Sequence, residues 1–352
     1  MSATIKGAAA ELGTERIRKL LVQYAVPAVI AMTAASLYNM VDSIFIGHGV
    51  GPLAISGLAL TFPLMNLAAA FGSLVGVGAA TLISMRLGQR DYETAQRVLG
   101  NVLVLNLIIG IAFGLVALLF LDSILYFFGA SEATIGYARE YMTVILLGNV
   151  VTHMYLGLNS VLRASGHPRK SMYATINTVV INTILDPLFI YGFGWGIRGA
   201  AIATVLAQLV STIGCFIYAF VRYPVLRLHR ADWRITMMDV KRHLVRGIPL
   251  GLQFSVLAIG IIVMQGGVVQ FDMRDGVMVS NAAQNGFGAA NRLFNLVATP
   301  MNALGGAMTS FTAQNLGAGQ YDRIRRGTLQ ALGMVSILAI LAAGTGLLLT
   351  RG

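Results

Sequence analysis

The stretch LLVQYAVPAVIAMTAASLYNMVDSIFIG at positions 20–47 decides the class of this protein. It is almost wholly apolar, and no lysine or arginine occurs between Lys19 and Arg86. A helix rises 1.5 Å per residue, so this stretch is long enough to cross a hydrocarbon core of about 30 Å. Asp42 lies within it, although a carboxylate is costly to hold inside a membrane. The stretch therefore predicts a membrane-spanning helix whose one carboxylate needs an explanation.

The composition of the whole chain agrees with a membrane protein. Of its 352 residues, 56% are hydrophobic and only 11% are charged, and the mean hydropathy is +0.74. The net charge of +11 does not indicate a nucleic-acid partner, because the basic residues cluster in short loops between apolar segments. The single cysteine, Cys215, rules out a disulfide framework within one chain. The N-terminus is polar, and we expect no removable signal peptide.

Apolar segments recur along the chain and predict an all-α polytopic membrane protein with nine transmembrane helices. The expected spans are 20–47, 52–85, 97–121, 134–162, 170–191, 198–222, 247–271, 284–313 and 328–350. Most of the basic residues fall in alternate connections, namely the N-terminal tail and those after the second, fourth, sixth and eighth spans. By the positive-inside rule, this alternation predicts a cytoplasmic N-terminus.

Two similar basic loops indicate an internal repeat. LGQRDYETAQR (87–97) and LGAGQYDRIRR (316–326) each follow one apolar helix and open another. The matched positions share a constant offset of 229 and are Leu87 with Leu316, Gly88 with Gly317, Tyr92 with Tyr321 and Arg97 with Arg326. Six helices separate the copies, so both enter the membrane in the same direction, which is typical of a parallel repeat.

The repeat predicts the domain organisation. We expect a cytoplasmic tail (1–19), a six-helix N-lobe (20–222), a basic cytoplasmic linker (223–246) and a partial C-lobe (247–352). Because the second copy holds three helices where the first holds six, the pattern favours a C-terminally truncated chain over a genuine nine-helix protein.

Four polar residues are expected at one depth. At 1.5 Å per residue, Asp42, Tyr141, Asp186 and Thr204 lie roughly 8–11 Å below the outer boundary, and Asn182 shares a helix face with Asp186. Two carboxylates at one site favour a proton carrier, because like charges cannot both ionise easily. The same oxygens suit Na⁺. Either reading makes these residues a coupling-ion site.

Purely structural interpretations stay open for several of these residues. Asp186 could cap a helix broken at Pro187, and Asp42 could cap free carbonyls. Pro27 predicts a bend in the first helix, as a hinge or as a static kink. Arg292 in the eighth span could line a substrate cavity or bond backbone carbonyls.

Two further features of the spans are interpreted as packing. The small residues around Gly72 and Gly76 predict close helix contact. His153 is interpreted as a hydrogen-bonded interior residue rather than a proton relay.

Two stretches carry a family resemblance. PAVIAMTAASLYNMVDSIFIGHGVGPLAISGLALTFP (27–63) and VLRASGHPRKSMYATINTVVINTILDPLFIYGFGWGIRGAAIATVLAQ (161–208) resemble the first and the fifth-to-sixth helices of MATE (multidrug and toxic compound extrusion) transporters. Full-length members have twelve helices in two six-helix lobes, so the chain looks like one lobe and half of the next.

The resemblance implies a function. It implies antiport of organic, cationic or amphiphilic drugs and toxic compounds against H⁺ or Na⁺ by alternation of the lobes. In the branch whose ion site lies in the N-terminal lobe, that site matches Asp42, Asn182, Asp186 and Thr204, with Tyr141 and Pro27 nearby. The seventh span lacks the acidic residue of another branch, which favours this one. We also expect Tyr38, Met65 and Arg292 to line a substrate cavity.

Two rival functions fit the residues less well. A lipid or lipid-linked oligosaccharide flippase has a related architecture but needs a strongly basic cavity. An intramembrane aspartyl enzyme also uses two aspartates, yet no Gly-Asp pair occurs in the chain. We therefore expect a monomeric, non-enzymatic transporter of the bacterial inner membrane. Its expected partners are small organic molecules and the bilayer, without nucleic acid and without a cofactor beyond the coupling ion.

Overall fold

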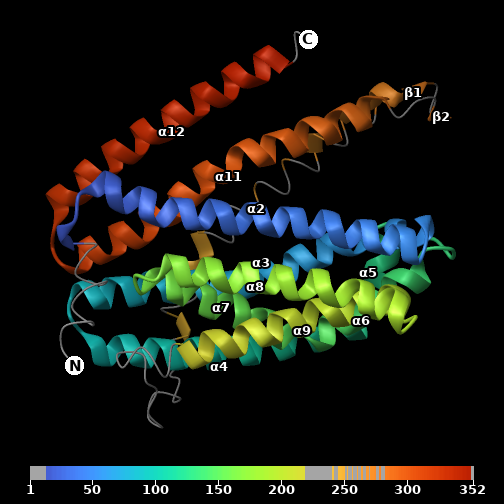
Figure 1. Cartoon of the computed structure of the whole chain (residues 1–352), viewed down its shortest axis with the longest axis horizontal. Coiled ribbons are helices and arrows are strands. Elements are labelled where there is room, and N and C mark those ends of the chain that lie inside the picture. Colours follow the sequence, from blue (N-terminus) through green and yellow to red (C-terminus); the bar gives the residue numbers. More distant parts are fainter. Residues whose placement is uncertain are drawn as a thin grey trace.

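The protein is an assembly of long helices (Figure 1). The computed structural model describes residues 13–218 and 282–349, together with residues 240–241, 245–249, 270–274 and 277–278 and a few isolated positions between 252 and 268. Most of the expected basic linker and of the seventh span therefore lies outside the described residues. The count of nine spans stays a prediction for that reason.

Helices occupy most of the described chain. Before the linker they are α2 (Ile17–Gly49), α3 (Pro52–Gly88), α4 (Tyr92–Leu119), α5 (Leu121–Phe127), α6 (Ile135–Leu147), α7 (Asn149–Ala164), α8 (Pro168–Pro187), the π-helix η1 (Leu188–Gly192) and α9 (Gly196–Ile217). After it come the 3-10 helix η5 (Gln270–Asp272), the strands β1 (Met273–Arg274) and β2 (Val277–Met278), and then α11 (Ala282–Gly317) and α12 (Tyr321–Leu349). The two short strands pair antiparallel and are the one departure, among the described residues, from the expected all-α fold.

The apolar character of the helices confirms a multi-pass membrane protein. Among the described residues, six helical segments are long and apolar enough to cross a membrane, and a seventh results if the bent pair α6–α7 is one span. Large apolar side chains on α4, such as Ile108 and Leu115, are 53% and 58% exposed. A surface of this kind suits a hydrocarbon environment better than water.

The expected fourth span is broken at Gly148. It forms α6 and α7, which meet at an angle of 56°. Glycine is a poor helix former, and the packing at this point also requires one. A Cβ atom on Gly148 would lie 2.5 Å from Cγ2 of Val205 on α9. Apolar periodicity in the sequence could not reveal this requirement for glycine, because the contact is made with Val205, 57 residues further along the chain.

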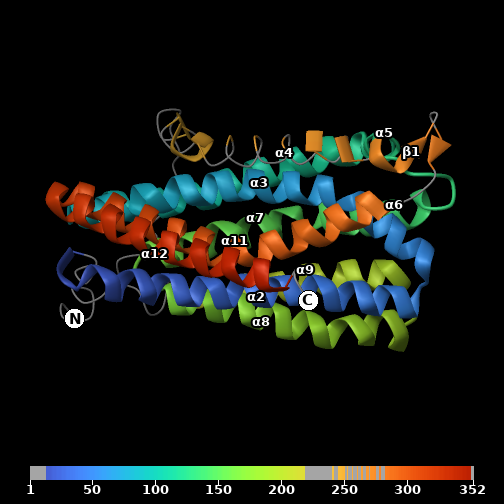
Figure 2. The ribbon, with the colours of Figure 1, turned by 90° about the horizontal axis from the view of Figure 1, so that it is seen from above.

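Basic residues gather at one end of the bundle. We define the basic end as the end where α2, α4, α8 and α12 begin and where α3, α7 and α11 finish, and the far end as the opposite one. Helices α2 and α8 run side by side along the bundle (Figures 1 and 2), and α9 packs on both of them. Helix α11 packs on α2 and α3. Helices α2, α8 and α9, all from the first part of the chain, therefore pack against one another.

The turns that follow α3 and α11 have the same geometry, as the repeat predicted for these loops requires. After α3, the amide of Asp91 donates to the carbonyl of Arg86 at 2.9 Å, and Arg90 has a φ of 61°. After α11, Gln320 donates to Asn315 at 2.8 Å, and Gly319 has a φ of 70°. Each of these residues lies 229 positions from its counterpart. Both turns are Schellman caps, in which a left-handed residue ends the helix.

The expected close packing around Gly72 and Gly76 is also confirmed. A Cβ atom on Gly72 would lie 3.1 Å from the ring of His153, and one on Gly76 would lie 3.1 Å from Cα of Gly157. Both contacts join α3 to α7. The absence of side chains lets these two helices approach closely, as is common where helices pack in membranes.

Candidate ion site between helices α2, α8 and α9

Three helices bring the predicted polar residues together. Helix α2 supplies Asp42, α8 supplies Asn182 and Asp186, and α9 supplies Thr204. Asn182 and Asp186 are one turn apart and so share a face of α8. Because α8 packs on both α2 and α9, this face meets the other two helices. The expected cluster of ion-coupling residues therefore exists as a spatial arrangement.

Thr204 is the centre of the hydrogen-bond network. Its Oγ1 accepts from Nδ2 of Asn182 at 3.3 Å and lies 3.0 Å from the hydroxyl of Tyr38. The same amide nitrogen of Asn182 is 3.2 Å from Oδ1 of Asp186, to which it donates. Tyr141 on α6 lies close to the side chain of Thr204. Through its two hydrogen-bond partners, Thr204 links residues of three helices, α2, α8 and α9.

The two carboxylates are buried against each other. The side chains of Asp42 and Asp186 lie close enough to influence each other electrostatically, and their exposed fractions are only 4% and 0%. Within the described part of the chain, the ion pairs join Glu15, Asp91, Glu93 and Asp122 to basic residues, and none includes either of these aspartates. Two buried carboxylates without a protein cation are costly unless a proton or a cation compensates their charge.

Three oxygen atoms of the cluster are unpaired among the described residues. Oδ1 of Asp42, Oδ1 of Asn182 and Oδ2 of Asp186 are buried and have no hydrogen-bond partner among the residues that the structure describes. Buried polar atoms are normally paired, so an unpaired set in one place needs an occupant. Carboxylate and amide oxygens are the ligands of hard cations, and a carboxylate pair also holds a proton. The donor set therefore fits either H⁺ or Na⁺.

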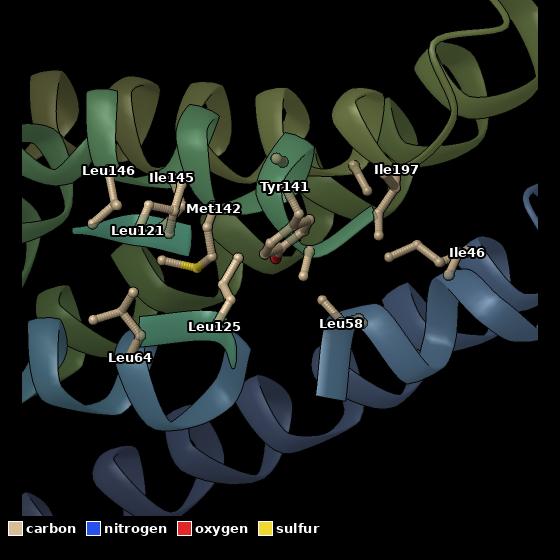
Figure 3. Close-up of a cluster of buried hydrophobic side chains, with 14 of the residues drawn as sticks. Ile46, Leu58, Leu64, Leu121, Leu125, Tyr141, Met142, Ile145, Leu146 and Ile197 are labelled. Carbon is tan, nitrogen blue, oxygen red and sulfur yellow. The ribbon is translucent and has the colours of Figure 1, made fainter. Parts of the chain in front are cut away.

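Tyr141 closes the cluster on the side of the far end. It is 1% exposed and belongs to a hydrophobic cluster that includes Leu58, Met142 and Ile197. Figure 3 shows its ring surrounded by these apolar side chains. Such a setting excludes water from this side, and electrostatic interactions inside the cluster are stronger as a result.

A π-helical turn follows Asp186 directly. Pro187 has no amide hydrogen, so it cannot continue the α-helical hydrogen-bond pattern. The chain widens into η1, where the amide of Phe193 donates to the carbonyl of Leu188 at 2.9 Å. Single π-turns inside helices occur frequently at functional sites. Since the helix does not stop at Pro187, and Asp186 accepts from the side chain of Asn182, the interpretation of Asp186 as a cap at a helix break is not supported.

The structure adds a contact to the role predicted for Tyr38. The sequence assigned Tyr38 to the substrate cavity, which stays a prediction, and the structure places its hydroxyl 3.0 Å from Oγ1 of Thr204 within the polar cluster. The sequence spacing could have predicted this neighbourhood, because Tyr38 and Asp42 are i and i+4 on α2 and therefore share a face.

The other predicted site residues lie elsewhere. Met65 packs against the same hydrophobic cluster as Tyr141, and its sulfur lies 3.6 Å from the hydroxyl of Thr61. Arg292 lies on α11, but its side chain is outside the described residues. The cavity role of both residues stays a prediction. Pro27 is buried within α2, which continues through it as a helix, so the expected hinge stays a prediction as well.

His153 is an interior residue, as expected. It is fully buried, between Gly72 and Phe113. Neither ring nitrogen has a hydrogen-bond partner in the described part of the chain. The interior position is confirmed, but the expected hydrogen bonding is not.

Comparison with known proteins relates the chain to multidrug transporters. The model of the MatE family matches residues 27–188 and 261–351. The probable multidrug resistance protein YoeA of Bacillus subtilis is 27% identical over 86% of this chain and 65% of its own length. The multidrug export protein MepA of Staphylococcus haemolyticus is 31% identical over 57% of this chain and 45% of its own length. The chain thus spans about two thirds or less of these two relatives.

Solved structures agree with the sequence comparison. A multidrug resistance MATE family transporter in an outward-facing conformation matches 96% of this chain and 73% of its own, with a TM-score of 0.87 and 27% identity. A transporter of the MOP superfamily from Pyrococcus furiosus matches 95% of this chain and 72% of its own, with a TM-score of 0.86 and 26% identity. The family model covers well over half of the sequence, and the fold agrees with it. The chain belongs to the MatE family of membrane transporters.

Proposed function

We propose that the chain is part of, or constitutes, a secondary antiporter that exports organic compounds in exchange for H⁺ or Na⁺. The observation that carries this proposal is the pair Asp42 and Asp186, which are buried together without a protein cation among the described residues. A group that must be neutralised by a mobile ion is what an ion-driven carrier requires, because binding and release of that ion then change the energy of the site. The names of the relatives, which describe multidrug export, supply the substrate class.

Because the site lies between helices, binding of the ion can change how these helices are arranged. Asp42 is on α2, whereas Asp186 and Thr204 are on α8 and α9. An ion bound to oxygens of all three helices draws α2 toward the other two, and its release lets the carboxylates repel each other. Pro27 lies on the basic-end side of Asp42 in α2 and is the proposed bend point for this movement. Alternating access then follows from two arrangements of α2, with and without the ion.

The proposed substrates are cationic or amphiphilic organic molecules, and the proposed location is the bacterial inner membrane. We place the basic end in the cytoplasm, since positively charged loops remain on that side. Lipid flippase activity finds no comparable support, because the described site is acidic whereas a lipid pyrophosphate needs cations around it. Neither an enzymatic reaction nor a cofactor is part of the proposal, and we expect the chain to act as a monomer.

Dye efflux tests the proposal. The chain is expressed in bacteria that lack their own exporters, and the loss of a preloaded cationic dye is followed while the proton and sodium gradients are collapsed separately. Efflux that stops when one gradient is collapsed, and that is absent in Asp42→Asn at equal expression, is the expected result. Efflux that continues without either gradient, or unchanged in the variant, would rule out ion-coupled export through this site.

A further inference from the structure

Two glycines of the repeat face each other's helix at the basic end. A Cβ atom placed on Gly88 would collide with the carbonyl of Gln314, and one placed on Gly317 would collide with the carbonyl of Met85. Gly88 corresponds to Gly317, and Met85 to Gln314, by the same offset of 229. The contact is therefore reciprocal, with each copy of the repeat offering the same surface to the other. This is the pattern of a two-fold interface.

The contact is made by backbone. The position of Gly88 is also only 3.1 Å, measured from an added Cβ, from the amide nitrogen of Ala318. A side chain at either glycine would hold the two turns apart, so only glycine permits this approach. Both glycines occupy the last turn of their helices, just before the matching Schellman caps. The two matching turns therefore bring the ends of α3 and α11 into direct contact.

The rest of this region reinforces the closure. A hydrophobic cluster joins Leu20, Leu21 and Tyr24 of α2 to Leu304 and Phe311 of α11. The guanidinium of Arg323, at the start of α12, donates to the carbonyl of Glu15. Toward the far end the elements separate. Figure 1 shows α11 beside α2 at the basic end and then diverging from it along its length.

We propose that the contact between Gly88 and Gly317 is the closed gate of the basic end. This inference rests on the proposed function, because alternating access requires a seal that parts when the site opens to that side. Packing of two glycine backbones excludes water and solutes at short range, yet each atom contact is individually weak. Such a seal can be tight and still open readily.

The test uses cross-linking in the full chain reconstituted into lipid vesicles. Cysteines replace Gln89 and Ala318, both exposed and related by the same offset, and Cys215→Ala removes the native thiol. With both glycines intact, a short bis-maleimide should join the two positions in high yield. Gly88→Ala and Gly317→Ala should each lower the yield several-fold and to a similar extent. Gly306→Ala on α11 is the matched control, because a Cβ there meets nothing within 4 Å.

The outcomes distinguish a failure of the proposed gate from a failure of the proposed export function. Equal cross-linking in Gly88→Ala and in the control would overturn the gate, and melting curves confirm that each variant is folded. Should Gly88→Ala not reach the membrane, Gly317→Ala tests the same contact from the other side. Cross-linking is read without any transport, so a chain that exports nothing still reveals whether the contact forms. Where export is present, cross-linked protein should lose it and an unlinked sample should keep it; export that persists in the linked protein would also overturn the gate.

Discussion

Asp42 on α2 and Asp186 on α8 lie close to each other while each remains almost completely buried. Neither takes part in an ion pair within the described residues. The cost of such a pair is avoided when a proton or a cation joins it. This relationship underlies the proposed mechanism, because it ties the charge of the site to the position of α2 relative to α8.

Asn182 should position the carboxylate of Asp186 rather than carry charge itself. Its amide bridges Asp186 and Thr204 at 3.2 and 3.3 Å. Asn182→Leu removes both bonds and an oxygen ligand, so we expect the affinity for the coupling ion to fall roughly 10- to 100-fold, the usual loss for a supporting ligand contact. The affinity is measured by ion titration of the purified protein. Thr152→Val is a matched control, since it removes a hydrogen bond between α7 and α9 outside the cluster; an equal loss there would contradict the positioning role.

Gly148 should be required for the bend between α6 and α7. An alanine there would place its Cβ against Val205 on α9. We expect Gly148→Ala to destabilise the protein by about 1–3 kcal/mol, as overpacking does, and Val205→Ala to relieve most of this loss in the double variant. Thermal unfolding in detergent measures both effects. Gly136→Ala is the control, because a Cβ at Gly136 meets nothing within 4 Å. A stable Gly148→Ala variant would show that packing is not the cause of the break.

Arg90 should be replaceable by glycine with a gain in stability. It holds a left-handed φ of 61° at the position where the matching turn has Gly319. The left-handed conformation costs a residue with a side chain about 1 kcal/mol, which glycine avoids. Arg90→Gly should therefore raise the free energy of unfolding by about this amount, and Gly319→Arg should lower it similarly. Unchanged unfolding curves for both variants would contradict the equivalence of the two turns.

Asp91 should stabilise the start of α4 in a pH-dependent way. Its carboxylate accepts from the amide of Thr94 at 3.1 Å, and this hydrogen bond lowers the pKa of Asp91 below its usual value. The stabilisation is therefore complete above the unfolded pKa of about 3.9 and is lost as the pH falls through the lower folded value. Asp91→Ala should cost about 1 kcal/mol at neutral pH, whereas Asp91→Asn should keep the cap and abolish its pH dependence. Unfolding curves from pH 3 to pH 7 measure this difference, and equal pH dependence in wild type and Asp91→Asn would contradict it.

Much of the site could be predicted from the sequence because its signals are local. Asp42 and Asp186 are conspicuous as carboxylates within apolar segments, and Asn182 stands one helical turn from Asp186. Counting residues from the helix ends was enough to place Thr204 and Tyr141 at the same depth. The offset between Gly88 and Gly317 was also visible, and it led to the repeat.

What could not be predicted depends on contacts between distant segments. The close packing of Gly148 against Val205 on α9 is one such contact, and the π-turn after Pro187 depends on which backbone hydrogen bonds can still form. The hydroxyl of Tyr38 on α2 lies 3.0 Å from that of Thr204 on α9. The matched glycines predicted a repeat, but only the packing of α3 on α11 reveals that they touch each other's helix.

Direct ion binding by the purified chain tests the central claim most directly. Proton release or uptake in weakly buffered solution and binding of radioactive sodium are measured for the wild type, Asp42→Asn and Asp186→Asn, each shown to be folded by its melting curve. The account predicts that the wild type binds one of these two ions and that each substitution abolishes this binding. A wild type that binds neither ion, or binding of the wild type's ion at the wild-type level in either variant, would contradict it.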